Sequence, residues 1–267
     1  IEPDPEKKDA LDFALWKFSD DPKWSWPSPW GRGRPGWHIE DTAITEKYFG
    51  PQYDLHGGGV ELKFPHHESE IAQQEALSGK KPFVKIWLHA GLLMVDGEKM
   101  SKSSGNFVTV RDFLKKHSVN TLRFLLISSH YRSPIDYNDR LVEQSEGALK
   151  TIEEFLNKLD LAQKALKYEN KKLDLKNYEN KFAAAMADDF NTPAALAVIF
   201  QLINDYQTKL WQLGKKDVKD LTAFITKNLV LFGLVFKKFQ VPISVKLLVE
   251  KRELMRKNKE FAKADQV

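Results

Sequence analysis

The spacing of the apolar residues changes near Tyr137, and this change is the strongest constraint on the fold of the chain. Before it, short apolar runs alternate with stretches of helical spacing, a pattern that indicates a parallel α/β sheet. After it, apolar residues such as Leu149 and Ile152 recur at the intervals of a helix. We therefore expect an α/β domain over residues 1–137 and an all-α bundle over residues 138–267.

Glycine, proline and other turn residues mark where the expected elements end. The first forty residues are so rich in tryptophan, proline and glycine that we expect an ordered loop there. The elements expected after it are a helix over 37–49, a strand over 53–56, a helix over 65–77, a strand over 84–95 and a helix capped by Thr109. In the second domain we expect a loop over 167–181, a helix with Thr192 as its N-cap, and helices over 221–236 and 245–261.

The composition excludes several classes of protein. The chain holds no cysteine, so disulfide bonds and thiolate chemistry are excluded. No apolar run approaches the ~20 residues that a membrane-spanning helix needs, and the polar start is unlike a secretory segment. We therefore expect a cytoplasmic protein with no membrane partner.

Positive charge is concentrated at one end of the chain. The formal net charge of +4 is by itself weak evidence for a nucleic-acid partner. Residues 246–263, however, include seven basic and three acidic side chains, and this excess equals that of the whole chain. The C-terminal segment is therefore the basic end.

A lysine-containing loop is the clearest sign of chemistry. Residues 99–103 read Lys-Met-Ser-Lys-Ser, after the turn signal Asp96-Gly97 and before Ser104-Gly105. Two ammonium groups and neighbouring hydroxyls on such a loop can neutralise charge that develops on a polyphosphate. A solvated basic loop is the alternative for two lysines at this spacing. The complete pentapeptide and its turns favour polyphosphate binding.

Histidine, glycine and carboxylate residues form a second group of candidates. His56 precedes three glycines at the expected end of a strand, where α/β proteins bind ligands, although a flexible loop is an equal alternative. Glu61 can accept hydrogen bonds from a ribose, and Trp37 can either line a small pocket or simply pack. His66 and Glu70 lie four apart on an expected helix, so they share a face and have the spacing of metal ligands. A surface hydrogen bond between them is the alternative.

Several short motifs follow one another along the chain. They are Asp12-Phe-Ala-Leu-Trp-Lys17, Ser28-Pro-Trp-Gly31, Gly33-Arg-Pro-Gly-Trp-His-Ile-Glu40, His56-Gly-Gly-Gly59, Phe64-Pro-His-His-Glu68, Lys99-Met-Ser-Lys-Ser103, His130-Tyr-Arg-Ser-Pro134 and Asp188-Asp-Phe-Asn-Thr-Pro193. Together they resemble the class I cysteinyl-tRNA synthetases, from about residue 10 to residue 267. This resemblance implies the second half of a Rossmann-like parallel-sheet catalytic domain, followed by a helical tRNA-binding bundle. It also implies an ATP-dependent cysteine–tRNA ligase whose substrates are cysteine, ATP with Mg²⁺, and tRNA.

The resemblance implies a role for each matching residue. Trp37 and His56 are implied to line the amino-acid pocket. The metal ligands, for Zn²⁺, are implied to be Asp41, His66 and Glu70. The other implied roles are ATP binding by Gly57, Gly58, Gly59, Glu61 and Lys102, stabilisation of the pyrophosphate leaving group by Lys99 and Lys102, and anticodon recognition by Arg256, Phe261 and Asp265.

Three residues depart from the pattern of that family. Asp41 stands where the family has a zinc-ligating Cys, Glu61 where it usually has Asp, and Phe261 where Trp is usual. A carboxylate is a harder ligand than a thiolate. The site therefore either holds zinc through oxygen ligands or recognises its amino acid without a metal.

The family also carries an ATP-binding His-x-Gly-His segment and a further ligating Cys upstream of the region matched here. We therefore expect the isolated chain to be inactive without that N-terminal segment, supplied by the same or a separate chain. Two alternatives remain: a non-catalytic tRNA-binding fragment or subunit, and a paralogue that joins activated cysteine to a small amine. The helical bundle and the basic end argue against the paralogue, because a small-molecule ligase needs no anticodon reader.

Overall fold

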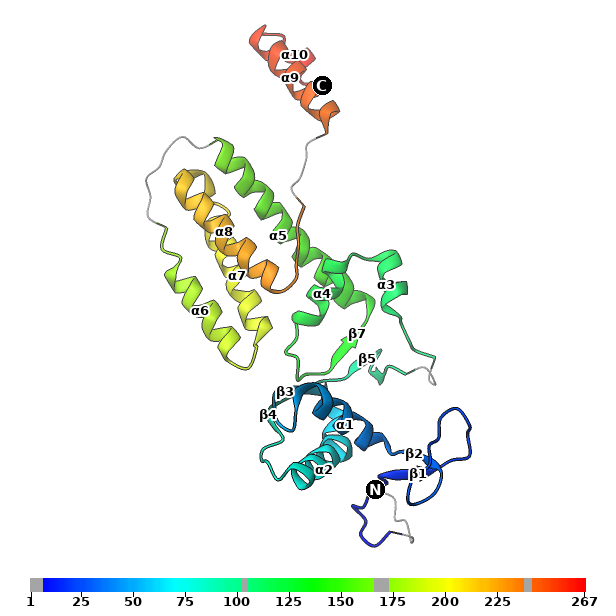
Figure 1. The fold of residues 1–267 in the computed structure, drawn as a ribbon. Helices are drawn as coiled ribbons and strands as arrows, with labels where there is room; N and C mark the ends of the chain where they lie inside the picture. Colours follow the sequence, from blue (N-terminus) through cyan, green and yellow to red (C-terminus); the bar gives the residue numbers. More distant parts are fainter. Residues whose placement is uncertain (1–6, 102–104, 166–172, 238–241) are drawn as a thin grey trace. The chain divides into compact units, whose positions relative to one another are not determined.

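The computed structural model describes residues 7–101, 105–165, 173–237 and 242–267 (Figure 1). It divides into two compact units: the chain up to Thr109 together with Ser129–Asn138, and Val110–Ser128 together with the chain from Asp139 onward. The second unit thus includes short helices that the sequence analysis assigned to the first domain. The functional division at residues 137 and 138 stays a prediction. No helix within the described ranges is long and apolar enough to cross a membrane.

The first unit combines small sheets with two helices that pack on each other. Its described elements are β1 (Trp16–Phe18), β2 (Gly33–Pro35), α1 (Trp37–Phe49), β3 (Tyr53–Gly59), α2 (Glu68–Ser78), β4 (Val84–Ala90), β5 (Leu93–Val95), β6 (Glu98–Lys99) and β7 (Ile135–Tyr137). Strands β3 and β4 are parallel, and α2 lies in the crossover between them. Strand β5 pairs with β6 in antiparallel and with β7 in parallel orientation. The expected parallel α/β character is confirmed.

The predicted helix over 37–49 is confirmed, and it ends at Gly50 with a φ of 80°. The strand predicted over 53–56 continues through the glycines to Gly59. The helix predicted from Pro65 starts as a π-helical turn, Lys63–His67, which continues into α2 at Glu68. Phe64 within this turn is extended, as residues before proline tend to be.

The single strand predicted over 84–95 is wrong, because the chain breaks at Gly91. There it leaves β3 and joins β7, with Gly91 N donating a 2.7 Å hydrogen bond to Tyr131 O. A Cβ at Gly91 would lie 2.2 Å from Ser133 O, so this crossing needs glycine. The prediction that the strand is buried also fails beyond Val84.

The second unit is helical, as predicted. Its described helices are α3 (Val110–Lys116), α4 (Val119–Ile127), α5 (Asp139–Ala165), α6 (Lys176–Ala187), α7 (Thr192–Tyr206), α8 (Lys215–Leu231), α9 (Ile243–Lys257) and α10 (Phe261–Ala264). Residues such as Ile152, Leu159 and Ile199 are fully buried in one apolar core built from α5, α7 and α8. Helix α6 occupies part of the predicted loop over 167–181, and α8 begins and ends earlier than predicted.

The interior of the first unit is polar. In its described part, the buried apolar side chains are Phe83 and Val84. The buried polar side chains between α1 and α2 are Thr42, His66, His67, Ser69, Glu70 and Gln74. Burying polar groups costs free energy unless they find partners, so this interior is unlike an ordinary core. It is the place to look for a functional site.

Candidate functional site

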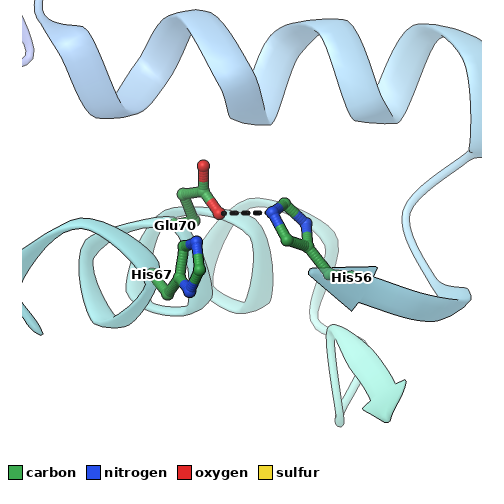
Figure 2. A group of neighbouring side chains, drawn as sticks. All are labelled: His56, His67 and Glu70. Atoms are coloured by element: carbon green, nitrogen blue, oxygen red, sulfur yellow. Dashed lines mark ion pairs between the residues drawn. The ribbon is translucent and has the colours of Figure 1, made fainter. Parts of the chain in front are cut away.

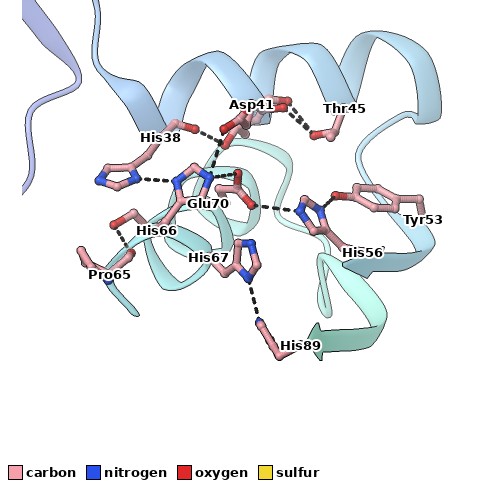
Figure 3. A network of polar contacts seen from close by, with 12 residues as sticks. His38, Asp41, Thr45, Tyr53, His56, Pro65, His66, His67, Glu70 and His89 are labelled. Carbon is pink, nitrogen blue, oxygen red and sulfur yellow. Dashed lines mark hydrogen bonds and ion pairs between the residues drawn. The ribbon is translucent and has the colours of Figure 1, made fainter. Parts of the chain in front are cut away.

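Histidines and carboxylates from four elements meet between α1, α2 and the parallel pair β3–β4 (Figure 3). Helix α1 supplies His38 and Asp41, which lie three residues apart on one face. The start of α2 supplies Glu70, and the turn just before it supplies His66 and His67. His56 comes from β3 and His89 from β4. We call these seven side chains the histidine cluster.

Asp41, His66 and Glu70 come together as one group. His66 Nε2 lies 3.0 Å from Asp41 Oδ2 and 3.3 Å from Glu70 Oε1. The other ring nitrogen of His66, Nδ1, lies 2.8 Å from His38 Nδ1. Metal-binding imidazoles usually have such a partner on their second nitrogen, because it fixes the ring. The structure thus brings together the three residues that the sequence analysis named as metal ligands.

A second group shares Glu70 with the first (Figure 2). His56 Nε2 lies 3.9 Å from Glu70 Oε2, and His67 is close to both. The Tyr53 hydroxyl contacts His56 Nδ1, and His67 Nδ1 lies 2.8 Å from His89 Nε2. Each imidazole therefore presents its remaining nitrogen to the cluster.

Burial decides the charge of these groups. Burial, assisted by the Asp41 carboxylate, raises the pKa of Glu70 to about 7. Burial lowers the pKa of His67 to about 4, with smaller contributions from the neighbouring histidines, and it also lowers the pKa of His56 and of His38. At neutral pH His67 is therefore uncharged, which is the form of imidazole that binds metal ions.

The surroundings of the Glu70 carboxylate indicate whether this cluster suits a cation. Its side chain is 1% exposed, and neither carboxylate oxygen accepts a hydrogen bond from the described residues. A buried carboxylate without donors is costly, and a bound cation removes that cost. The donor atoms of Asp41, His66 and Glu70 all lie within 4.8 Å of one another, and nitrogen with oxygen ligands is an accepted zinc set. The residues present fit a zinc ion.

Aromatic rings and a cavity adjoin the histidine cluster. Trp37 stacks on His66 with ring centroids 4.5 Å apart, and Trp87 lies 4.8 Å from the His56 ring. Beside them is a cavity of about 450 Å³ lined by residues that include Lys63, His67, Trp87, His89, Tyr131 and Arg132. Pockets of this size hold small-molecule ligands. Trp37 contacts His66 and His56 faces Glu70, so the two residues predicted to share a pocket both adjoin the His66–Glu70 pair, but neither lines this cavity.

The lysine loop begins on a tight hairpin. Asp96 and Gly97 both have positive φ, 51° and 81°, so the predicted turn between β5 and β6 is confirmed. Lys99 ends β6, and its Nζ lies 3.9 Å from Glu61 Oε1. The resemblance implied that Lys99 stabilises the pyrophosphate leaving group and that Glu61 binds ATP. Lys102 lies outside the described residues.

The Asn106 side chain forms two hydrogen bonds with the backbone of the lysine loop, a role that was not predicted from the sequence. Its Oδ1 accepts a hydrogen bond from Ser101 N at 2.9 Å, and its Nδ2 donates to Lys99 O at 3.2 Å. Asn side chains often form such local hydrogen bonds near turns. The Asn that follows the Ser-Gly sequence was therefore the feature that could have predicted this role.

Two of the three glycines of β3, Gly58 and Gly59, lie close against protein side chains. A Cβ at Gly58 would lie 2.8 Å from His67 Cε1, and one at Gly59 would lie 2.4 Å from Glu61 Oε2. Gly57 has room, since its nearest neighbour would be Leu88 O at 3.6 Å. Gly58 is therefore required by the buried His67, whether or not a ligand also approaches the strand, whereas at Gly59 the exposed Glu61 side chain has room to move aside.

The predicted tRNA-binding residues lie on one helical hairpin, formed by α9 and α10. Arg256 Nη2 lies 3.5 Å from Asp265 Oδ1, and Phe261 is 58% exposed. With more than half of its surface exposed, Phe261 is not packed into the helical bundle within the described residues. An exposed aromatic ring is suited to stacking on bases, and a guanidinium on the same hairpin is suited to binding a base edge or a phosphate.

Several residues of the site escaped the sequence analysis. His38, Tyr53 and His89 orient the metal-binding candidates, and Trp87 covers two of the histidine rings. Trp87 and His89 are two apart on β4, so strand alternation places them on one face. That spacing was the only signal, because their partners are 20 or more residues away in sequence.

Comparisons with known proteins cover nearly the whole chain. Residues 1–147 match the family model for the tRNA synthetases class I (C) catalytic domain, and residues 181–237 match the DALR domain. The chain is 48% identical over 205 residues to a cysteine–tRNA ligase of Laribacter hongkongensis, covering 77% of this chain and 44% of that protein. It is 40% identical over 276 residues to one of Bacillus cytotoxicus, covering 100% and 59%. The chain thus spans about half the length of these curated relatives.

Among solved structures, the fold of the chain is similar to that of LeuRS in its ternary complex with tRNA and LeuAMS, from Agrobacterium radiobacter K84. The TM-score is 0.57 at 16% sequence identity, over 82% of this chain and 32% of that one. At this identity the likeness establishes a common fold.

Proposed function

The chain belongs to the cysteinyl branch of the class I tRNA synthetases, and from that premise we propose that it is the downstream part of an ATP-dependent cysteine–tRNA ligase. The observation that carries the proposal is the convergence of Asp41, His66 and Glu70 beside Trp37 and His56. These are the residues that the resemblance assigns to metal binding and to the amino-acid pocket, and they come from separate elements. The roles that follow are part of the same proposal.

Recognition of the amino acid takes place at the histidine cluster. Trp37 and His56 flank the proposed amino-acid site, and Tyr53 holds the ring of His56 in place. Asp41, His66 and Glu70 would hold Zn²⁺, which when bound supplies a Lewis-acidic centre for the thiolate of cysteine. Glu70 and His66 are buried, so they exclude water from that side of the substrate.

Activation of the amino acid requires positive charge near the phosphates of ATP. The cysteine carboxylate attacks the α-phosphate, the bond to the β-phosphate oxygen breaks, and pyrophosphate leaves with the negative charge. Lys99 and Lys102 stabilise that developing charge, and Mg²⁺ accompanies the nucleotide. Glu61 and the backbone of Gly57–Gly59 face the ribose and base. Most of the rate comes from positioning and from charge stabilisation.

The activated cysteine then passes to tRNA. The ribose hydroxyl at the tRNA end attacks the acyl carbon, and AMP leaves. We assign the tRNA anticodon arm to the basic hairpin α9–α10, through Arg256, Phe261 and Asp265. In this proposal residues 1–137 carry the catalytic part and residues 138–267 the tRNA-binding part.

The parallel pair β3–β4 indicates where a partner segment belongs. Leu55 and Ile86 are paired in register, and both are about half exposed. Parallel sheets are normally covered on both faces, so a two-stranded one with exposed apolar residues needs further strands or helices. We propose that the upstream segment implied by the resemblance provides this cover.

The test is reconstitution. This chain is mixed or co-expressed with the upstream segment of the Bacillus cytotoxicus relative, and cysteine-dependent exchange of pyrophosphate into ATP is measured, followed by charging of tRNA. We expect both activities only when the two parts are present. Tight tRNA binding without exchange in the mixture would instead support the non-catalytic fragment. Exchange followed by transfer to a small amine, and not to tRNA, would support the paralogue.

A further inference from the structure

The two oxygens of the Glu70 carboxylate point to different histidines. Oε1 lies 3.3 Å from His66 Nε2, and Oε2 lies 3.9 Å from His56 Nε2. Neither oxygen accepts a hydrogen bond from the described residues, although the side chain is buried. An ion held by Asp41, His66 and one Glu70 oxygen leaves the second oxygen buried and without a partner. A buried polar atom in that state destabilises the fold unless something binds it.

The second oxygen has its own pair of imidazoles. The donor atoms of His56, His67 and Glu70 all lie within 4.8 Å of one another (Figure 2). Ligand atoms around a tetrahedral zinc ion lie about 3.3 Å apart, given bonds of about 2.0–2.1 Å. Small side-chain rotations therefore bring these three residues into coordination range.

Both imidazoles are held in the orientation that a metal ion requires. The Tyr53 hydroxyl contacts His56 Nδ1, and His89 Nε2 lies 2.8 Å from His67 Nδ1. In each ring Nε2 is the nitrogen left for a ligand. Such outer partners fix the ring and its tautomer in known metal sites.

We propose that His56, His67 and Glu70 form a second site for a divalent transition-metal ion, and that Glu70 bridges it to the ion held by Asp41 and His66. Two imidazoles and one carboxylate suit Zn²⁺, Co²⁺ or Fe²⁺, and they leave coordination positions open for an external ligand. Paired metal sites in proteins have separations of about 3.5–4 Å, which one carboxylate can span. This site follows from the geometry of the cluster and does not depend on ligase activity.

The stoichiometry of zinc tests the second site. The metal-free chain is titrated with Zn²⁺ against a chromophoric chelator, and bound zinc is measured by elemental analysis. We expect two ions per native chain, one for Asp41→Asn, one for His67→Gln and none for Glu70→Gln. Tyr53→Phe keeps both sites but weakens the affinity for one ion by about 10–100-fold, as removal of an outer partner does.

Controls separate loss of a site from loss of the fold. His117→Gln is the matched control, because His117 pairs with Glu146 at 2.8 Å in the second unit, and this variant should bind two ions. Co²⁺ absorption of Asp41→Asn should retain the spectrum of a nitrogen-and-oxygen site, which a misfolded chain lacks. The second site is overturned if the native chain binds one ion and His67→Gln binds it equally well. It is also overturned if a folded Asp41→Asn binds none.

Discussion

Gly58 shows how closely one residue of β3 is fitted to the histidine cluster. The Cβ of an alanine there would lie 2.8 Å from Cε1 and 3.0 Å from Nε2 of His67. His67 cannot withdraw freely, because it is buried and held to His89. Glycine is thus required at position 58 because of His67, a side chain nine residues away in sequence.

We predict that Gly58→Ala destabilises the first unit by about 1–3 kcal/mol, the usual cost of overpacking. Urea unfolding followed by tryptophan fluorescence measures it, since the tryptophans other than Trp211 belong to this unit. Gly57→Ala is the matched control and should change little, because its Cβ would meet Leu88 O at an ordinary 3.6 Å. Equal effects of the two substitutions would contradict the prediction.

The positive charge of Lys102 is proposed to act mainly in the transition state. In an enzyme reconstituted from this chain and an upstream segment, Lys102→Ala should slow adenylate formation by roughly 2–4 kcal/mol, the scale of one preorganised donor. Cysteine binding should change little, because the charge on pyrophosphate develops only during the reaction. Single-turnover activation measures the rate. Lys115→Ala, on a surface pair with Asp112, serves as the control. An unchanged activation rate would remove Lys102 from this role.

At the scale of elements, the N-cap of α7 lies one residue before the predicted one. Thr192 was predicted as the N-cap, but Asn191 Oδ1 accepts the capping hydrogen bond from Ala194 N at 3.1 Å. Thr192 instead donates to Ile127 O at 2.7 Å. Both residues are good caps in isolation, so only the long-range bond to α4 decides between them.

Asn191→Ala should therefore lower the free energy of unfolding of the second unit by about 1 kcal/mol, as the loss of an N-cap does. Thermal unfolding followed by far-ultraviolet circular dichroism detects it, because this unit is helical. Gln201→Ala, exposed in the middle of the same helix, should be neutral or slightly stabilising. If the control loses as much stability as the variant, capping is not the cause.

The hairpin α9–α10 carries the proposed anticodon contact. Phe261→Ala should weaken tRNA binding by about 1–3 kcal/mol if its ring stacks on a base, and Arg256→Ala should weaken it by a comparable amount. Filter binding at moderate salt with cognate and non-cognate tRNA measures both affinities. Lys246→Ala, on the same helix, should mainly reduce the salt dependence.

The comparison between tRNAs decides the meaning of that result. Unchanged affinity in both hairpin variants would exclude the hairpin as the binding site. Equal weakening for all tRNAs would keep binding but exclude anticodon recognition, because phosphate contacts carry no sequence information.

At the scale of the whole molecule, local patterns predicted more than long-range ones. Helix α1 follows from the glycine at its end, and α5 follows from the helical spacing of residues such as Leu149 and Ile152. The α/β-then-helical fold class is confirmed. The break at Gly91 could not be predicted, because its cause is a contact with Ser133 more than forty residues away. The histidine cluster was predicted in part: His66 and Glu70 share a helix face, but Tyr53 and His89 enter only through the parallel pairing of β3 with β4. Motif spacing identifies ligands along one element, and only packing identifies the residues that orient them.

The isolated chain should fail to form aminoacyl-adenylate. It spans about half the length of its curated relatives, and β3–β4 leaves Leu55 and Ile86 exposed on a parallel pair that needs a cover. Exchange of pyrophosphate into ATP, with and without cysteine, measures the activity, and zinc binding by the same sample shows that the cluster is formed. We expect bound zinc but no cysteine-dependent exchange.

Adding the upstream segment should restore pyrophosphate exchange. It should also protect the backbone amides of β3 from hydrogen–deuterium exchange. Exchange by the chain alone would contradict the division of the catalytic site between two segments, since the histidine cluster and the lysine loop would then be sufficient for activation.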